Sequence, residues 1–377
     1  STPLYSSAAS DVYKRQGNTA FATGVGLYNF TAVYEGSFRP KESGAYELLI
    51  EGDDGYRVYV NGEKVIDYWG EHASAKRDYT LKATAGTDYK IRIEYMQAGA
   101  EALLRFDLGI YRHISPEMVV DRVKEADIVI FAGGISPSLE GEEMYSVNSP
   151  GFAGGDRTSI ELPQVQRDIL KALKKAGKKV VFVNCSGSAV ALVPEMESCD
   201  AILQAWYPGQ SGGLAVADVL FGDFNPSGKL PVTFYKNTDQ LPDFEDYSMK
   251  NRTYRYMTEA PLFPFGYGLS YTTFDISKGR LNKKTISAGQ GLNFKVNVKN
   301  TGKYDGAEVI QVYVRKVDDA EGPIKSLRAF RRVPLKAGET CVVSIDLLPT
   351  TFEFFDPTTN TMRIMPVSYT HLTLPTN

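Results

Sequence analysis

The sequence has few of the residues that most often bind metals or form disulfides. Its 377 residues include three cysteines and three histidines. Cys185, Cys199 and Cys341 are odd in number and lack metal-ligand spacing, so we expect buried free thiols rather than a disulfide framework. Two native histidines, His72 and His113, are too few for a histidine-based metal or nucleophile site. We predict neither a metal nor a cofactor.

The sequence also lacks a basic excess and a long apolar run. A formal net charge of −3 excludes the electrostatic footprint of a nucleic-acid or anionic-membrane partner. No apolar run reaches the roughly 18 residues that a membrane helix needs. The chain is 43% hydrophobic and 23% charged, which is typical of globular protein long enough for two or three cores. These features leave the cellular compartment open, and the periplasm and the extracellular space both fit.

Both ends of the sequence are expected to be foreign to the protein. The DNA GATGTGTATAAGAGACAG encodes Asp11–Gln16, and its reverse complement encodes Val367–Leu372 in another frame. This mirror relation resembles a transposon end translated at both edges of an assembled fragment. We therefore exclude 1–16 and 367–377 from the fold, and we expect the native N-terminus to lie upstream.

Residues 17–112 predict a small antiparallel β domain. Short stretches alternate between apolar and polar residues and are separated by Gly, Asn-Gly and Asp-Gly. The clearest hairpin is Val60-Asn61-Gly62-Glu63, because a type I′ turn requires positive φ at both central residues.

Residues 113–276 change to helical periodicity alternating with buried strands. A helix is expected from Ser115 as N-cap with Pro116 at its first position, and a second helix over 161–177 ends at Gly177. Apolar strands are expected at 127–134, 178–186, 199–206 and 229–235, with a glycine-opened helix over 209–222. This order predicts an α/β sandwich with a mostly parallel sheet and helices on both faces. From Leu281 alternation returns, and 281–366 predict a β-sandwich.

Four strings occur in order: GGISPSLEGEEM (133–144), GGDR (154–157), DVLFGDFNPSGKLPVTFY (218–235) and FPFGYGLSYTTF (263–274). Together they resemble the C-terminal half of glycoside hydrolase family 3, the retaining exo-β-glycosidases that include β-glucosidases and β-xylosidases. In the same terms, 17–112 resembles the protective antigen β domain that is inserted in some members. Residues 281–366 resemble the fibronectin type III-like domain, for which we expect a structural role without a ligand.

The resemblance implies that this chain holds half of a catalytic pair. Retaining enzymes use a carboxylate nucleophile and an acid/base roughly 5–5.5 Å apart. In the family the nucleophile is an Asp on a preceding (β/α)8 barrel, which we expect to be missing here. The chain alone is therefore expected to be inactive.

The acid/base candidates lie in the loop after the strand at 127–132. Three glutamates, Glu140, Glu142 and Glu143, are typical of a solvated acidic loop when they are taken alone. The family's acid/base commonly lies six residues after the second glycine of such a strand end, and a count from Gly134 gives Glu140. A Glu-x-Glu in other members keeps Glu142 as the alternative.

Three further pairs of neighbouring residues are candidates for a binding or a structural role. Trp206 and Tyr207 are candidates for a sugar-stacking wall, or equally for core aromatics. The neighbours Asp156 and Arg157 are expected to be structural, as an ion pair that ties the loop base to the next helix. Paired aspartates bind calcium and sugar together in related adhesin domains, which makes Asp53 and Asp54 candidates, but turn geometry is favoured here.

The sequence thus predicts a fragment of an exo-β-glycosidase that acts on β-linked plant oligosaccharides or aryl glycosides. Whether the sugar is glucose or xylose stays open, because most subsite residues are expected on the barrel. The alternative is a non-catalytic carbohydrate-binding protein built from the two β domains.

Overall fold

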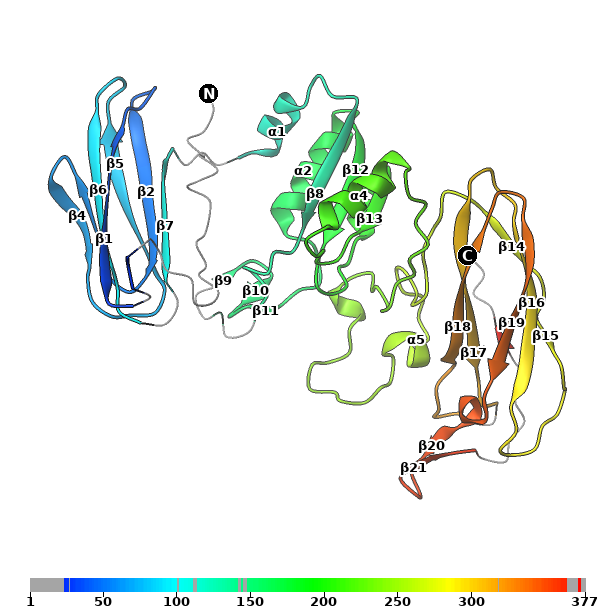
Figure 1. Ribbon diagram of the computed structural model, residues 1–377. Helices are drawn as coiled ribbons and strands as arrows, with labels where there is room; N and C mark the ends of the chain where they lie inside the picture. The colour runs from blue at the N-terminus through cyan, green and yellow to red at the C-terminus, as the bar shows by residue number, and fades with distance from the viewer. Residues whose placement is uncertain are drawn as a thin grey trace. The chain divides into compact units, whose positions relative to one another are not determined.

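The structure, a computed structural model, describes residues 24–26, 28–99, 102–110, 114–141, 144, 148–317, 319–364 and 372–373. The chain forms two compact units, Ser1–Ile114 and Ser115–Asn377, which are described separately (Figure 1). Most of both ends that were expected to be foreign, together with Glu142, Glu143 and His113, lie outside the described residues.

The first unit is an antiparallel β structure of two sheets. One sheet has the order β1-β6-β3-β4 and the other β5-β2-β7. The strands are β1 Phe30–Phe38, β2 Gly44–Asp53, β3 Tyr56–Val60, β4 Glu63–Tyr68, β5 Ala75–Ala83, β6 Tyr89–Gln97 and β7 Leu103–Gly109. Alternate residues of both sheets, such as Leu48, Val58 and Ile93, form its buried core. Asn61 and Gly62 have φ of 51° and 86°, which confirms the hairpin predicted between β3 and β4.

The second unit begins with an α/β region. Its main sheet, in the order β13-β12-β8, is parallel throughout, and a small sheet in the order β11-β10-β9 is antiparallel. Figure 1 shows α2 behind the main sheet and α4 in front of it. The elements are α1 Pro116–Arg122, β8 Ile128–Gly134, β9 Asn148–Ser149, β10 Phe152–Ala153, β11 Asp156–Arg157, α2 Gln164–Lys175, β12 Lys179–Cys185, α3 Val193–Ser198, β13 Ala201–Gln204, α4 Gly212–Phe221, a 3₁₀ turn Thr238–Gln240, and α5 Thr253–Tyr256.

The strand expected at 229–235 is absent as a regular element. Phe234 forms an isolated bridge with Phe263, and Leu230 exchanges hydrogen bonds with Gly266 and Tyr267. Pro231 lies between these contacts and has no backbone N–H, so it interrupts the ladder. The expectation of a strand is therefore wrong, although the segment does pair with residues 262–267 at its two ends.

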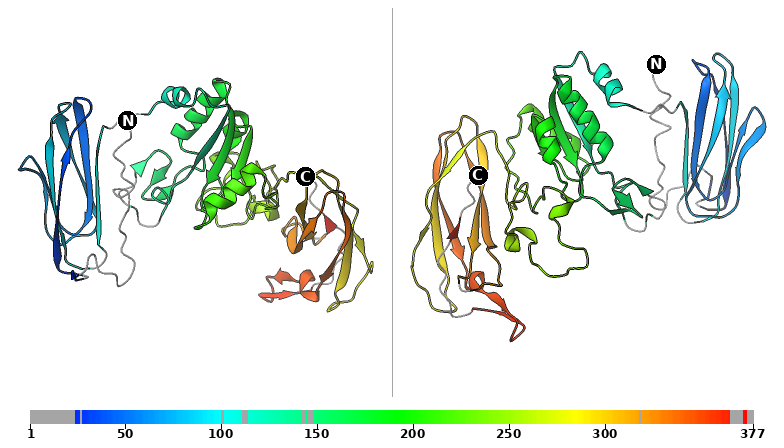
Figure 2. Two further views of the ribbon diagram at one scale, coloured as in Figure 1. Left: turned by 45° about the horizontal axis from the view of Figure 1, so that its top comes forward. Right: turned by 180° about the vertical axis from the view of Figure 1, so that it is seen from behind.

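The unit ends in a sandwich of two antiparallel sheets (Figure 2). Its first sheet contains β14, β15, β16 and β19, and its second contains β18, β17 and β22. The elements are β14 Phe274–Ile276, β15 Arg280–Leu281, β16 Leu292–Asn300, β17 Gly306–Val314, β18 Ser326–Leu335, β19 Thr340–Leu347, a 3₁₀ turn Pro349–Phe352, β20 Phe354–Asp356, β21 Thr361–Arg363 and β22 Leu372–Thr373. Inward residues such as Val296, Val298 and Ile310 form its core.

Specific contacts join the sandwich to the α/β region. Lys229 forms a buried ion pair with Glu308 of β17, with Nζ and Oε1 2.8 Å apart. Gln311 of β17 donates its side-chain amide to the Gly266 carbonyl at 3.0 Å and accepts from the Tyr313 hydroxyl at 2.6 Å. The string FPFGYG therefore forms part of a domain junction.

Candidate active site

The carboxyl end of β8 is fixed by its neighbours. Gly134 has φ of +120°, and a Cβ at this position would lie 1.9 Å from the Cys185 carbonyl oxygen of β12. Only glycine fits this approach. The side chain of Gln166, on α2, donates to the Gly134 carbonyl at 2.7 Å and accepts from its N–H at 2.8 Å. The loop that follows therefore starts from a defined point.

The loop that carries Glu140 is a short turn held by the GGDR string. Leu139 and Glu140 both donate their backbone N–H to the Ser136 carbonyl. Gly141 N–H then donates to the Gly155 carbonyl at 3.2 Å. Gly155, with φ of +91°, lies so close that a Cβ would be 2.1 Å from the Gly141 oxygen. The two glycines thus fix the loop immediately after Glu140.

Glu140 receives two hydroxyl donors from the ends of the other two strands. Ser188, after β12, donates its Oγ–H to Oε1 at 3.2 Å, and Tyr207, after β13, donates its hydroxyl to Oε2 at 3.4 Å. The carboxyl ends of parallel strands meet at one edge of a sheet, where functional loops gather in α/β folds. Glu140 is half-buried at this edge.

Arg157 lies behind this cluster. Its Nη1 donates to Ser188 Oγ at 2.9 Å and to the Ala189 carbonyl at 3.0 Å, and its Nε donates to the Ser159 carbonyl at 3.2 Å. Burial lowers the pKa of the guanidinium, and the carboxylates of Glu140 and Glu161 act in the opposite direction. Hydrogen bonds therefore run from Arg157 through Ser188 to Glu140.

The expected ion pair between Asp156 and Arg157 is wrong. Within the described residues these two side chains form no ion pair, and Arg157 instead fastens the loop base to the segment after β12. Arg157 Nη2 is buried and has no hydrogen-bond partner among the described residues. Arg157 does hold the base of the loop, as expected, but it does so by hydrogen bonds to Ser188 and Ala189 and not by a contact with the next helix.

Trp206 and Tyr207 point to different places. Trp206 has φ of 59°, an uncommon conformation for a bulky residue, and its ring packs against the core at 6.0 Å from Phe234. Tyr207 is 41% exposed and lies over Gly187, where a Cβ would be 2.6 Å from the ring. Trp206 is therefore a core aromatic, which was one of its two expected roles, whereas the hydroxyl of Tyr207 contacts Glu140. A sugar contact by either residue stays a prediction.

The carboxylate of Asp54, in the first unit, accepts hydrogen bonds from three backbone N–H groups. The donors are the N–H groups of His72 at 3.2 Å, of Ala98 at 2.7 Å and of Gly99 at 3.3 Å. With φ of 64°, Asp54 sits in a turn. Among the described residues, no group of three or more potential ligands could hold a metal ion. The turn alternative therefore describes Asp54.

Sequence reasoning missed Ser188 and Gly187 as site residues. The usable signal was position, because these residues follow a buried parallel strand whose end meets that of β8.

Two comparisons with family models cover most of the chain. A model of the glycosyl hydrolase family 3 C-terminal domain matches residues 35–271, and a model of the fibronectin type III-like domain matches 308–373. The chain belongs to glycoside hydrolase family 3. Among the described residues, no helix is long and apolar enough to cross a membrane.

The family 3 relatives are β-xylosidases and β-glucosidases. A xylan 1,4-β-xylosidase of Xylanibacter ruminicola is 51% identical over 94% of this chain and 40% of its own length. A periplasmic β-glucosidase of Salmonella typhimurium is 40% identical over 62% of this chain and 31% of its own length. The crystal structure of a β-glucosidase from Kluyveromyces marxianus with glucose has 28% identity and a TM-score of 0.69, covering 88% of this chain and 41% of that one. The chain thus spans less than half the length of these relatives.

Proposed function

We propose that the chain is the carboxyl-terminal part of a retaining exo-β-glycosidase that removes terminal β-linked sugars from plant oligosaccharides. Glu140 is its acid/base. One observation carries this proposal: the Glu140 carboxylate lies at the carboxyl end of a parallel strand and accepts one hydroxyl on each oxygen. A β-xyloside is the first substrate to test, because the xylosidase relative matches 94% of the chain.

The neighbours of Glu140 have positioning roles in this proposal. Ser188 and Tyr207 hold the carboxylate in one orientation, and Arg157 holds Ser188. A retaining enzyme needs a nucleophilic carboxylate roughly 5–5.5 Å away, on the other side of the anomeric carbon. We place that nucleophile on a barrel in another part of the full-length protein. Glu140 first protonates the leaving-group oxygen and then deprotonates the water that hydrolyses the glycosyl intermediate.

Replacing Glu140 with glutamine in the full-length enzyme tests the assignment. Glu140→Gln should slow substrates with basic leaving groups by about 10²–10⁴-fold, and activated aryl glycosides much less, because an acidic phenol leaves without protonation. Azide needs no deprotonation, so it should restore turnover on activated substrates. The measurement is kcat/KM across aryl β-xylosides of graded leaving-group acidity.

Glu142→Gln is the matched control. It removes one carboxylate from the same loop and should give neither the leaving-group dependence nor azide rescue. If Glu142→Gln gives both and Glu140→Gln gives neither, the acid/base is Glu142 and the count from Gly134 is wrong by two residues.

The 377-residue chain by itself is predicted to be inactive. An acid without a nucleophile cannot form the glycosyl intermediate. The purified chain should release no phenol from aryl β-xylosides or β-glucosides above a heat-treated control. Turnover that survives purification and is lost in Glu140→Gln would contradict the missing-nucleophile argument while supporting Glu140.

A further inference from the structure

The sandwich carries a cationic groove that is separate from the Glu140 site. A space of about 310 Å³ lies over the exposed face of β16 and beside β15. The strands β15 and β16 are paired neighbours in the sandwich (Figure 1). Its lining includes three cations and three amides and no carboxylate: Lys278, Arg280, Lys295, Asn282, Asn293 and Asn297. This composition is unusual in a chain whose formal net charge is −3.

The rim of the groove is preformed. At one end Asn297 N–H donates to Ser277 Oγ at 2.9 Å, and at the other Asn293 N–H donates to Asn282 Oδ1 at 2.8 Å. Between these points Gly279 lies directly on the Phe294 ring, where a Cβ would be 2.1 Å from a ring carbon. The segment that carries Lys278 and Arg280 is therefore fastened to β16, and little reordering would be needed to bind a ligand.

Two of the cations lie directly opposite each other. Arg280 and Lys295 are Cα partners in the antiparallel register of β15 and β16. Like charges in this position destabilise a sheet. Neither side chain forms an ion pair with a described residue. A carboxylate on the neighbouring strand β19, that of Asp346, instead accepts a hydrogen bond from Asn293, its partner in the register, at 2.7 Å.

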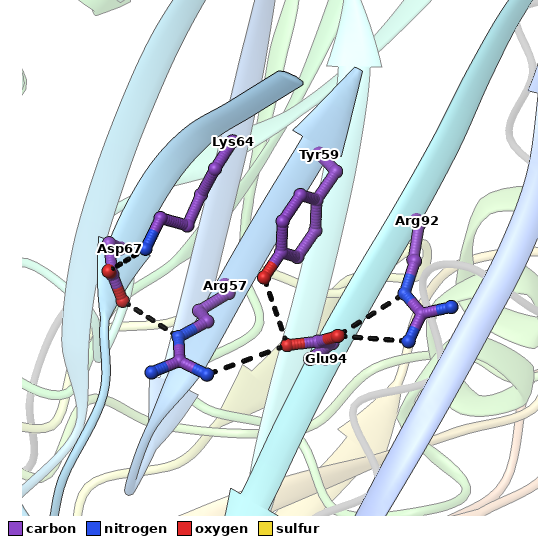
Figure 3. A network of polar contacts seen from close by, with 6 residues as sticks. All are labelled: Arg57, Tyr59, Lys64, Asp67, Arg92 and Glu94. Atoms are coloured by element: carbon purple, nitrogen blue, oxygen red, sulfur yellow. Dashed lines mark hydrogen bonds and ion pairs between the residues drawn. The ribbon is translucent and has the colours of Figure 1, made fainter. Parts of the chain in front are cut away.

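The β1-β6-β3-β4 sheet of the first unit shows how cations on a sheet surface are usually paired with carboxylates. There Arg57 lies between Asp67 at 2.9 Å and Glu94 at 3.7 Å, and Arg92 contacts Glu94 at 2.9 Å (Figure 3). Each of these cations has a carboxylate partner on a neighbouring strand or its own. The groove on the sandwich breaks this pattern, and a local rule that is broken without compensation is typical of a functional site.

We propose that the groove binds the carboxylate of an acidic saccharide, a uronic acid on an oligosaccharide. Arg280, Lys278 and Lys295 would supply charge-assisted hydrogen bonds to the carboxylate. The Asn297 side chain, which bonds to no described residue, can donate and accept with sugar hydroxyls. Leu281 and Val342 give an apolar surface for the C–H face of the ring. The volume is at the lower end of small-molecule sites, roughly 300–1,000 Å³.

The choice of a saccharide rests on the proposed function, whereas the anionic character rests on the groove alone. Calorimetric titration of the whole chain separates the two. The probes are a xylotriose that carries one glucuronic acid, neutral xylotetraose, and inorganic phosphate. The acidic saccharide should bind at least about 10-fold more tightly than the other two probes, and its affinity should fall as salt is raised from about 0.02 to 0.2 M. No hydrolysis is measured, so failure here leaves the Glu140 test unaffected.

Variants distinguish binding from a structural role. Arg280→Gln and Lys295→Gln should each weaken binding of the acidic saccharide at least about 10-fold. Each should also raise Tm by about 1–3 °C, because one of the two opposed positive charges is removed. Lys299→Gln is the matched control, since Lys299 is on the same exposed face of β16 outside the groove lining and should change neither value.

Three results would overturn the proposal. Absence of binding by the acidic saccharide would remove the site. Equal affinity for phosphate would reduce it to a simple anion site without saccharide recognition. A lower Tm with unchanged binding in Arg280→Gln would assign the cations a structural role.

Discussion

Tyr207 keeps its phenolic proton beside a carboxylate. Burial, followed by the negative charge of Glu140, raises the pKa of Tyr207 above its ordinary value of 10. The hydroxyl therefore remains protonated, and a donor to Glu140, at any pH below about 10. Arg157 is also constant, because a guanidinium does not deprotonate in proteins. Tyr207 and Arg157 thus keep their protonation states, as the proposed acid/base role of Glu140 requires.

Glu161 makes a contribution to stability that depends on pH. Burial opposes its ionisation, but hydrogen bonds from Ser159 and from the N–H and Oγ1 of Thr238 outweigh burial and lower its pKa from 4.5 to about 2. Since the folded-state pKa is depressed, the stabilisation is fully present above about pH 4.5 and is lost as pH falls toward 2.

Glu161→Gln should therefore destabilise the chain by about 1.5–3 kcal/mol at pH 7, and by progressively less as the pH falls below 4.5. Urea unfolding of both proteins at several pH values between 7 and 3 measures this difference. Exposed Glu197 on α3 is the control, and Glu197→Gln should change stability by less than about 0.5 kcal/mol. A difference for Glu161→Gln that is constant with pH would contradict the low pKa.

Two features of the site could not be predicted from the local sequence. Trp206 and Tyr207 are adjacent, and nothing in their sequence signals that positive φ at Trp206 sends one ring to the core and the other to Glu140. The contact from Arg157 to Ser188 spans 31 residues and depends on how β11 sits beside the end of β12. Both features follow from tertiary packing, which periodicity does not describe.

Elements with local signals were predicted well. Ser115 caps α1 by accepting the N–H of Met118 at 3.4 Å, with Pro116 in the first turn. The second helix ends before Gly177, which has φ of 75°, but it begins at Gln164 rather than 161, because the residue before Pro163 is disfavoured in helix. The end of β8 at Gly134 also agrees with the strand expected at 127–134, and Gly134 has φ of 120°.

The bridge from α2 to β8 can be tested with two glutamines on one helix. Gln166→Ala leaves the N–H and carbonyl of buried Gly134 without their partner, so it should cost about 1–3 kcal/mol in stability and lower kcat of the full-length enzyme by displacing Glu140. Gln164→Ala removes the same side chain at an exposed position and should change stability by less than about 0.5 kcal/mol. Equal effects of the two variants in urea unfolding and kcat would argue against a positioning role for Gln166.

At the scale of the whole second unit, one buried ion pair holds the sandwich to the α/β region. Lys229 and Glu308 side chains are 10% and 7% exposed. Lys229→Met should cost about 3–5 kcal/mol, because Glu308 is left as an uncompensated buried charge. The double variant Lys229→Met/Glu308→Leu should recover much of this loss. Urea unfolding of the two single variants and the double variant measures the coupling.

An exposed ion pair in the same unit is the control. Lys174 and Asp200 are 3.1 Å apart and are 43% and 44% exposed. Lys174→Met should therefore change stability by no more than about 1 kcal/mol. If Lys229→Met costs no more than Lys174→Met, the junction does not depend on the buried pair.

The junction has a consequence for protein engineering. Gly266 can carry no side chain, since a Cβ would lie 2.2 Å from Gln311 Oε1, and Gln311 in turn is held by Tyr313. The backbone of residues 264–268 in the α/β region therefore fits against the side chains of Gln311 and Tyr313 in the sandwich. A fibronectin type III-like domain transplanted from another family 3 protein would fit the Gly266 carbonyl only if it brought an amide and a phenol at the same two positions. Chimaeras of this chain should therefore exchange residues 264–268 and β17 together, as a single cassette.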